Sequence, residues 1–124
     1  MAKKLDYDYC RAAPVMEWMS NKWSMAILLQ LESAEGRCRF NDLFRSIPHV
    51  SEKMLASSLD LLCADGLVFR TDYGGIPPRV EYGLTLLALS LLPLIHGINR
   101  WGQEHFDEVI RSRREYAEQH HNRE

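Results

Sequence analysis

The chain has 124 residues, which is enough for one domain with a modest hydrophobic core. Its hydrophobic fraction of 46% is typical of a globular protein and excludes a disordered one. The formal net charge is −2, so the composition does not show the overall basic character of many nucleic-acid-binding domains. Any surface for an acidic partner must therefore come from the placement of charge.

No segment predicts membrane insertion or secretion. The N-terminal residues 1–9 are polar, and we expect that they are not a signal peptide. The most apolar stretch, 84–98, is shorter than the roughly 20 residues of a spanning helix, and Pro93 and Gly97 interrupt it. We expect a cytoplasmic protein that has no membrane partner.

The sequence contains no constellation that predicts an enzyme, a metal site or a cofactor. None of the three cysteines, Cys10, Cys38 and Cys63, belongs to a Cys-x-x-Cys pair, so neither a zinc ribbon nor a disulfide framework is indicated. The five histidines show no metal-ligand spacing, and there is no phosphate-binding glycine loop. We expect Cys38 and Cys63 to be structural.

Two helices are predicted first. Pro14 opens a short helix with apolar residues at helical spacing. A second helix is predicted over 23–32, and its inner face is expected to consist of Trp23, Ile27, Leu28 and Leu31.

Two further helices follow a short strand at 37–40. Asn41 is expected to cap a helix that ends before Pro48, and Ser51 to cap the next one, over 52–64. Gly66 ends that helix. The inward side chains of the second of these helices are predicted to be Met54, Leu55, Leu59 and Leu62.

Strands are predicted at 67–71 and 79–84, joined by a long hairpin tip over 72–78. A helix then runs from 85 to about 114, in one or two pieces around Pro93, and 115–124 are expected to be frayed. The order predicts a mostly α fold with a small β-hairpin, a winged helix-turn-helix, as a single domain over 1–124. Residues 51–64 are its recognition helix, 67–84 its wing and 85–114 its dimerisation helix.

Several motifs occur together in this order. They are Cys10 twelve residues before Lys22-Trp23, Arg39-Phe40-Asn41-Asp42-Leu43, Ile47-Pro48, Asp65-Gly66-Leu67-Val68, Pro77-Pro78-Arg79-Val80-Glu81-Tyr82, and Trp101-Gly102. On these motifs the chain resembles the HxlR-type regulators, which are relatives of the MarR group, over roughly residues 10–105. The resemblance implies a DNA-binding transcriptional regulator that dimerises through its N- and C-terminal helices. The chain departs from the family pattern at Arg11, Ser20-Asn21, Ala88 and in the outer residues of 52–64.

The inward leucines of 51–64 leave a polar face that we expect to lie in the major groove. Lys53 and Ser57 can hydrogen-bond base edges or phosphates, and Ala56 can contact a thymine methyl group. Ser51 is expected to offer backbone N–H groups to a phosphate. The alternative is an ordinary amphipathic helix with a solvated face.

The hairpin tip is expected to contact DNA through Arg79 and Tyr73, and the resemblance supports this role for Arg79. A surface ion pair with Glu81 or Asp72 is the alternative for Arg79. Lys22 and Arg39 are secondary candidates for phosphate contacts, and a plain solvated charge is the alternative for each.

The helix after Thr85 is apolar on more than one side, which predicts a subunit interface. A twofold homodimer would place two recognition helices about 34–36 Å apart on a palindromic site. Burial within its own domain is the alternative for this helix. The expected interface residues are Leu87, Leu91, Leu94, Ile95, Ile98 and Trp101.

Cys10 is a candidate redox sensor. The resemblance implies this role, since in some HxlR-type proteins the equivalent cysteine senses oxidants or electrophiles. The adjacent Arg11 favours the reactive thiolate. The alternative is an inert thiol.

We therefore interpret the chain as a sequence-specific, homodimeric repressor that binds double-stranded DNA and is released by an oxidant or a small-molecule effector. The alternative is a winged-helix protein-interaction module without DNA binding. The acidic Glu52 and Asp60 on the recognition helix favour that alternative.

Overall fold

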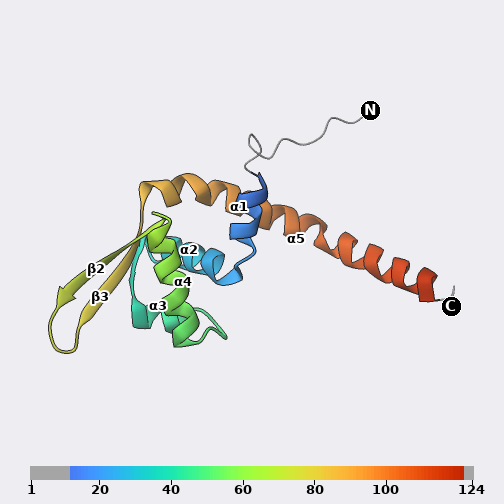
Figure 1. The fold of residues 1–124 in the computed structure, drawn as a ribbon. Helices are drawn as coiled ribbons and strands as arrows, with labels where there is room; N and C mark the ends of the chain where they lie inside the picture. The colour runs from blue at the N-terminus through green and yellow to red at the C-terminus, as the bar shows by residue number, and fades with distance from the viewer. Residues whose placement is uncertain (1–11, 122–124) are drawn as a thin grey trace. The chain divides into compact units, whose positions relative to one another are not determined.

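The fold is described from a computed structural model, in which residues 12–121 are described. The helices are α1 (Ala12–Met19), α2 (Lys22–Ser33), α3 (Phe40–Ser46), α4 (Glu52–Ala64) and α5 (Leu86–His121). The strands are β1 (Arg37–Arg39), β2 (Val68–Gly74) and β3 (Arg79–Leu84). Figure 1 shows these elements in chain order, and they confirm the predicted mostly α winged helix-turn-helix.

The chain divides into two compact units, one ending at Ser90 and the other beginning at Leu91. The first unit holds α1 to α4, the sheet and the first turn of α5. The second is the rest of α5. That the whole chain forms one domain stays a prediction.

Leucine and isoleucine side chains of three helices form the core of the first unit. Its fully buried members are Ile27, Leu28 and Leu31 of α2, Leu43 of α3, and Leu55, Leu59 and Leu62 of α4. At helical spacing these side chains fall on one face of each helix, so α2 and α4 pack against each other through them. A hydrogen bond from Trp18 Nε1 to Asp65 Oδ2, 2.9 Å long, also links α1 to the end of α4.

The boundaries of α4 follow from local signals and agree with the prediction. Ser51 Oγ accepts the Met54 N–H at 3.1 Å and caps the first turn. Gly66 has a φ of 76°, and the Leu67 N–H returns to Leu62 O at 3.0 Å, which is a left-handed helix end. The predicted inner face was wrong at one position. Met54 is 45% exposed, and Ser58 is buried in its place.

Two other predictions need correction. Asn41 does not cap α3, because the helix begins at Phe40, two residues earlier than a cap at Asn41 implies, and its N-cap, Arg39, makes no side-chain capping bond. The last helix is continuous through Pro93 and extends to His121, beyond the predicted end near 114 and into the segment expected to be frayed. Proline at 93 removes one helical N–H, and the surrounding turns keep the helical path.

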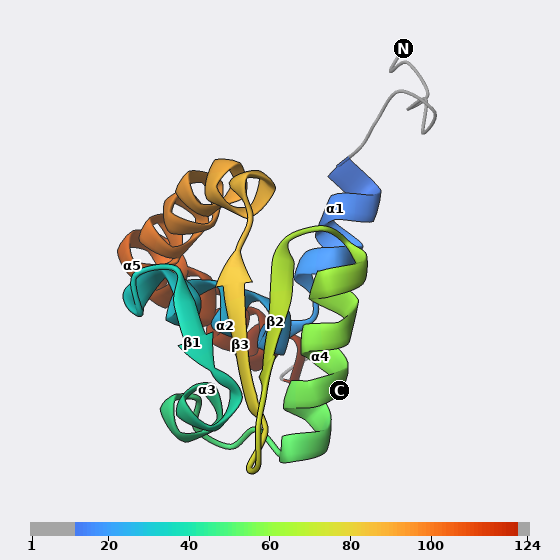
Figure 2. The same cartoon turned by 90° about the vertical axis from the view of Figure 1, so that its left-hand side faces the viewer.

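The wing belongs to a three-stranded antiparallel sheet in the order β1-β3-β2, seen in Figure 2 beside α4. The strand predicted at 37–40 is β1, and it pairs with β3 at the edge of the hairpin. β2 continues to Gly74, past the predicted 71, and so shortens the tip. Within the described residues, no helix has both the length and the apolarity needed to cross a membrane.

Gly83 at the centre of the sheet makes room for an aromatic ring. It is paired with Arg37 of β1 and Phe69 of β2, so all three residues share one face. A Cβ atom at position 83 would lie 2.4 Å from Phe69 Cζ. The Arg37 guanidinium lies 5.4 Å from the centre of the Phe69 ring. Glycine here therefore permits a stack of Phe69 and Arg37 over the central strand.

We predict that Gly83→Ala lowers the free energy of unfolding by about 1–3 kcal/mol, because the added methyl group displaces the Phe69 ring. Urea unfolding measures the change. In a Phe69→Ala background the same substitution should cost less, since the clashing ring is absent. Gly97→Ala is the control, because nothing lies near its Cβ position and alanine favours a helix. Equal losses in the two backgrounds would contradict the stack.

Candidate nucleic-acid interface

The outer face of α4 carries the residues predicted to read DNA. Lys53, Ala56 and Ser57 are exposed, as are the acidic Glu52 and Asp60. Ser57 Oγ donates a hydrogen bond to Met54 O at 3.2 Å, so the hydroxyl proton is used within α4 itself. Lys53 makes no ion pair within residues 12–121. The predicted face is thus open to a partner, with one cation between two carboxylates.

The turn before α4 has an unusual backbone. His49 has a φ of 69°, in the left-handed region that non-glycine residues seldom adopt. It lies between Pro48, which ends α3, and Val50, which is buried. Buried Ile47 and Val50 hold the two ends of this turn and fix the angle at which α4 leaves it.

The wing arginine that we expect to contact DNA is held by its neighbours. Arg79 Nη2 lies 3.0 Å from Glu81 Oε1, and its guanidinium lies 4.9 Å from the centre of the Tyr73 ring. This ion pair is the alternative considered for Arg79 from the sequence. The Arg79 side chain is still 50% exposed. Contact of Arg79 and Tyr73 with DNA stays a prediction.

Glu81 is the centre of a polar cluster on the outer face of the sheet. Its side chain is only 12% exposed, and Arg37 Nη1 approaches its other oxygen at 4.0 Å. Arg37 also donates to the Tyr73 hydroxyl at 3.4 Å. The hydrogen bond from Arg79, then that from Tyr73, lower the pKa of Glu81 below its ordinary value. The cluster joins β1, β2 and β3, so it stiffens the wing.

Arg37, Arg70 and Glu81 are site residues that the sequence did not reveal, Glu81 having been considered only as a partner for Arg79. Arg37 reaches the cluster because β1 pairs with β3, a register that no local pattern specifies. Arg70 lies 3.8 Å from Asp72 within β2. Alternating charges along 70–72 and 79–81 were the available signal.

The secondary candidates lie in two different places. Arg39 is exposed at the start of α3 and makes no ion pair with any described residue. Lys22 opens α2, and its Nζ lies 4.7 Å from the Trp23 ring. The phosphate roles proposed for both stay predictions.

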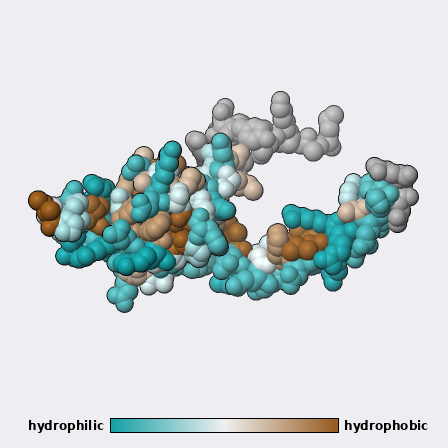
Figure 3. Space-filling model, turned by 90° about the horizontal axis from the view of Figure 1, so that it is seen from below, coloured by the Kyte–Doolittle hydropathy of each residue, from teal (hydrophilic) through white to brown (hydrophobic). Residues whose placement is uncertain are grey.

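The expected interface residues of α5 are not equally accessible. Leu87, Leu94, Ile98 and Trp101 are 51–65% exposed, whereas Ile95 is buried and Leu91 is half-buried. Figure 3 shows hydrophobic surface interrupting the hydrophilic surface along α5, and also at the wing tip, where Ile76 is fully exposed. Dimerisation through this helix stays a prediction.

Two of the three cysteines have partly shielded thiols. Burial, and then the charge of Asp42, raise the pKa of Cys38; burial, and then Asp60, raise the pKa of Cys63. Both are therefore poor nucleophiles at neutral pH. Cys10, the predicted sensor, lies outside the described residues. No three His, Cys, Asp or Glu side chains between 12 and 121 are grouped to hold a metal ion.

This geometry, with a helix-turn-helix, an open α4 face and an adjoining wing, agrees with comparisons to known proteins. Residues 18–110 match the HxlR-like helix-turn-helix family. The chain belongs to this family and is a helix-turn-helix transcriptional regulator, a class of DNA-binding proteins and not of enzymes.

Relatives of known sequence or structure agree with this assignment. The chain is 38% identical over 110 residues to the uncharacterised regulator YtfH of Escherichia coli, covering 89% of this chain and 86% of YtfH. A MarR-family regulator from Porphyromonas gingivalis superposes with a TM-score of 0.72 at 36% identity, over 83% of this chain and 99% of that one. The redox regulator HypR in its oxidised form gives 0.67 at 31% identity, over 77% and 97%.

We predict that Glu81→Gln destabilises the protein at neutral pH and not in acid. The pKa of Glu81 is lower in the folded than in the unfolded chain, so its stabilising effect is present above the unfolded value, about 4.3, and disappears as the pH falls through the folded value. Urea midpoints at pH 7 and below pH 4 measure this. Glu118→Gln, an exposed carboxylate with no ion pair in the described chain, is the control. A difference that persists undiminished in acid would contradict the cluster.

Proposed function

We propose that this regulator is a repressor that binds a palindromic operator as a homodimer. The observation that supports it most directly is the exposed polar face of α4 beside the stiff wing of β2 and β3. In this arrangement α4 enters the major groove, and Lys53, Ala56 and Ser57 contact base edges. The wing follows the adjacent backbone with Arg79 and Tyr73.

Phosphate contacts are assigned to the cations around that helix. Arg39, just before α3, makes no ion pair with any described residue, so no ion pair has to break before it contacts a phosphate. Arg79 must exchange Glu81 for a phosphate, or share its guanidinium between the two. Ser51 keeps its side chain as the α4 cap and offers backbone N–H groups, while Lys22 adds a more distant charge.

Twofold symmetry is proposed from the exposed side chains Leu87, Leu94, Ile98 and Trp101 of α5, with Leu91 and Ile95 beside them. An apolar surface of this extent favours a second copy of the chain over solvent. A dimer would place its two α4 helices about one DNA turn apart, and a palindromic operator matches that symmetry.

We predict that the protein binds fragments of its own genome with an affinity that falls steeply as salt rises, because cations displace counterions from phosphates. Arg79→Ala and Arg39→Ala should each weaken binding and reduce the slope of log K against log salt by about 0.9. Fluorescence anisotropy over a range of salt concentrations measures both. Arg113→Ala, an equal charge change outside the proposed surface, should leave the slope unchanged.

Absence of salt-sensitive binding to any fragment would contradict the proposal. It would favour a protein-interaction module, which the exposed acidic residues Glu52 and Asp60 also permit. If binding is found instead, footprinting the DNA beside the gene would locate the operator.

A redox response through Cys10 is the second part of the proposal. HypR, 31% identical to this chain, is described as a redox regulator. In this chain Cys38 and Cys63 have raised pKa values, which leaves Cys10 beside Arg11 as the best candidate for a reactive thiolate.

We predict that Cys10→Ser retains DNA binding and loses the response to diamide or a quinone. Diamide and quinones both react with a cysteine thiolate, and serine has no thiol that could react in the same way. Anisotropy before and after treatment measures the response. Cys63→Ser is the matched control and should respond as the unmodified chain does. A full response in Cys10→Ser would exclude this sensor.

A further inference from the structure

The tip of the wing, residues 73–78, is apolar although it lies in water. Its sequence is Tyr-Gly-Gly-Ile-Pro-Pro, and every one of these residues is exposed. Ile76 is fully exposed. Turns usually combine glycine and proline with Asn, Asp or Ser, whose side chains bond to the backbone nearby. Ile76 has no part in the core, so the folding of this chain does not account for a large apolar side chain at this position.

The tip is also narrow and stiff. Gly74 and Gly75 precede Ile76 and carry no side chains, and the two prolines after it have φ angles fixed by their rings. The Asp72 carboxylate accepts the Gly74 N–H at 2.8 Å and holds the base of the turn. Insertion of such a tip into a partner costs little conformational entropy. Ile76 therefore stands at the end of the hairpin as a single apolar wedge.

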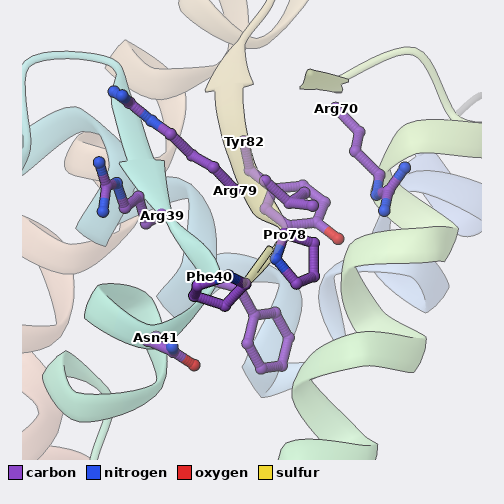
Figure 4. Close-up of a pocket in the computed structure, with 9 residues that line it drawn as sticks. Arg39, Phe40, Asn41, Arg70, Pro78, Arg79 and Tyr82 are labelled. Carbon is purple, nitrogen blue, oxygen red and sulfur yellow. The ribbon is translucent and has the colours of Figure 1, made fainter. Parts of the chain in front are cut away.

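Behind the tip, each face of the hairpin carries one arginine. Arg70 is paired with Tyr82, and Arg79 lies three positions before Tyr82, so strand alternation places the two arginines on opposite faces. Figure 4 shows their side chains directed to opposite sides of the hairpin. They are 49% and 50% exposed, and each has a carboxylate partner in its own strand, at 3.8 Å and 3.0 Å. The intervening segment 73–78 contains no carboxylate that would repel a phosphate.

This combination fits the minor groove of a duplex better than a protein surface. The minor groove is about 6 Å wide and is edged by the phosphates of both strands, so a narrow apolar tip can enter it while a cation on each face meets one strand. A stable protein interface buries about 800 Å² on each partner, which is more than a single turn presents. In both Figure 1 and Figure 2 the tip lies at the same end of the first unit as the start of α4, so one duplex can contact both.

We propose that Ile76 inserts into the minor groove beside the half-site contacted by α4 and opens the stack between two adjacent base pairs. This inference rests on the proposed function, because it requires DNA binding. Unstacking costs least at pyrimidine–purine steps such as TA and CA, which kink easily. The wing thereby selects a deformable step at a position where no side chain reads the base edges, and the operator is kinked there.

The test uses duplexes that the unmodified full chain selects from a random pool of about 40 base pairs, which is long enough for two half-sites one turn apart. 2-Aminopurine, whose fluorescence rises when it is unstacked, is placed in turn at each step beside the half-sites of one selected duplex. The unmodified chain should raise the fluorescence at one step per half-site. It should also bend this duplex by at least about 20° more than Ile76→Asn does, as measured by circular permutation in gels.

Three substitutions separate a wedge from other roles of the tip. Ile76→Asn has a similar size and is polar, so it should abolish the fluorescence rise and weaken binding by about tenfold. Ile76→Met stays apolar and should retain most of both effects. Ile76→Lys should steepen the salt dependence by about 0.9 without restoring the fluorescence. The urea midpoint should stay unchanged in all three, since Ile76 buries no surface.

Leu86→Asn is the matched control. Leu86 is 85% exposed and lies beyond the end of β3 that is opposite to the tip. The same loss of an exposed apolar side chain at this position should change neither the fluorescence nor the bend.

The outcomes distinguish this inference from the proposed function. If the selected duplex gives the same fluorescence and bend with the unmodified chain and with Ile76→Asn, only the wedge is overturned. A full fluorescence rise with Ile76→Lys would also overturn it, because an apolar side chain would not be needed. If the chain selects no duplex at all, the proposed function fails, and the wedge fails with it.

Discussion

The rotation of α4 about its own axis is the constraint on which the proposed interface depends. Leu55, Leu59 and Leu62 are fully buried against α2, so the helix cannot turn without exposing them. Each residue of a helix advances by about 100°, so a shift of one position would carry Ala56, Asp60 and Cys63, the residues that follow these leucines, toward the core. Burying an unpaired charge costs far more free energy than an exposed leucine gains by burial. The same packing that stabilises the fold thus presents Lys53, Ala56 and Ser57 outward.

The sheet provides the second fixed element beside that helix. Its outer face is held by Glu81 of β3, which contacts Arg79 in the same strand, Arg37 of β1 and Tyr73 of β2. Surface ion pairs contribute little to stability individually, but this carboxylate is largely shielded and has three partners. The pairing holds Arg79 in place and also competes for it. Under the proposed function, the contact between Arg79 and a phosphate must offset the weakening of the Arg79–Glu81 ion pair.

The sequence predictions were correct where the signal lay within a few residues of the chain, and they failed where it depended on distant residues. Ser51 and Gly66 mark the ends of α4 by hydrogen bonds within a few residues, and both ends were predicted correctly. The prediction of which α4 residues are buried was wrong at Met54. Met54 and Ser58 both flank the buried leucines of α4, and only the shape of the core decides which of the two is buried. The cluster at Glu81 was not predictable in this way. It requires the register of β1 on β3, which joins residues more than forty positions apart.

Charge placement explains how a chain of net charge −2 can have a surface suited to DNA. The sheet and the first turn of α3 hold four arginines, at 37, 39, 70 and 79, against three carboxylates, Asp42, Asp72 and Glu81. The exposed face of α4 has Lys53 between Glu52 and Asp60. Affinity for the phosphate backbone would then arise mainly from the wing side, while α4 contributes shape and hydrogen bonds to base edges.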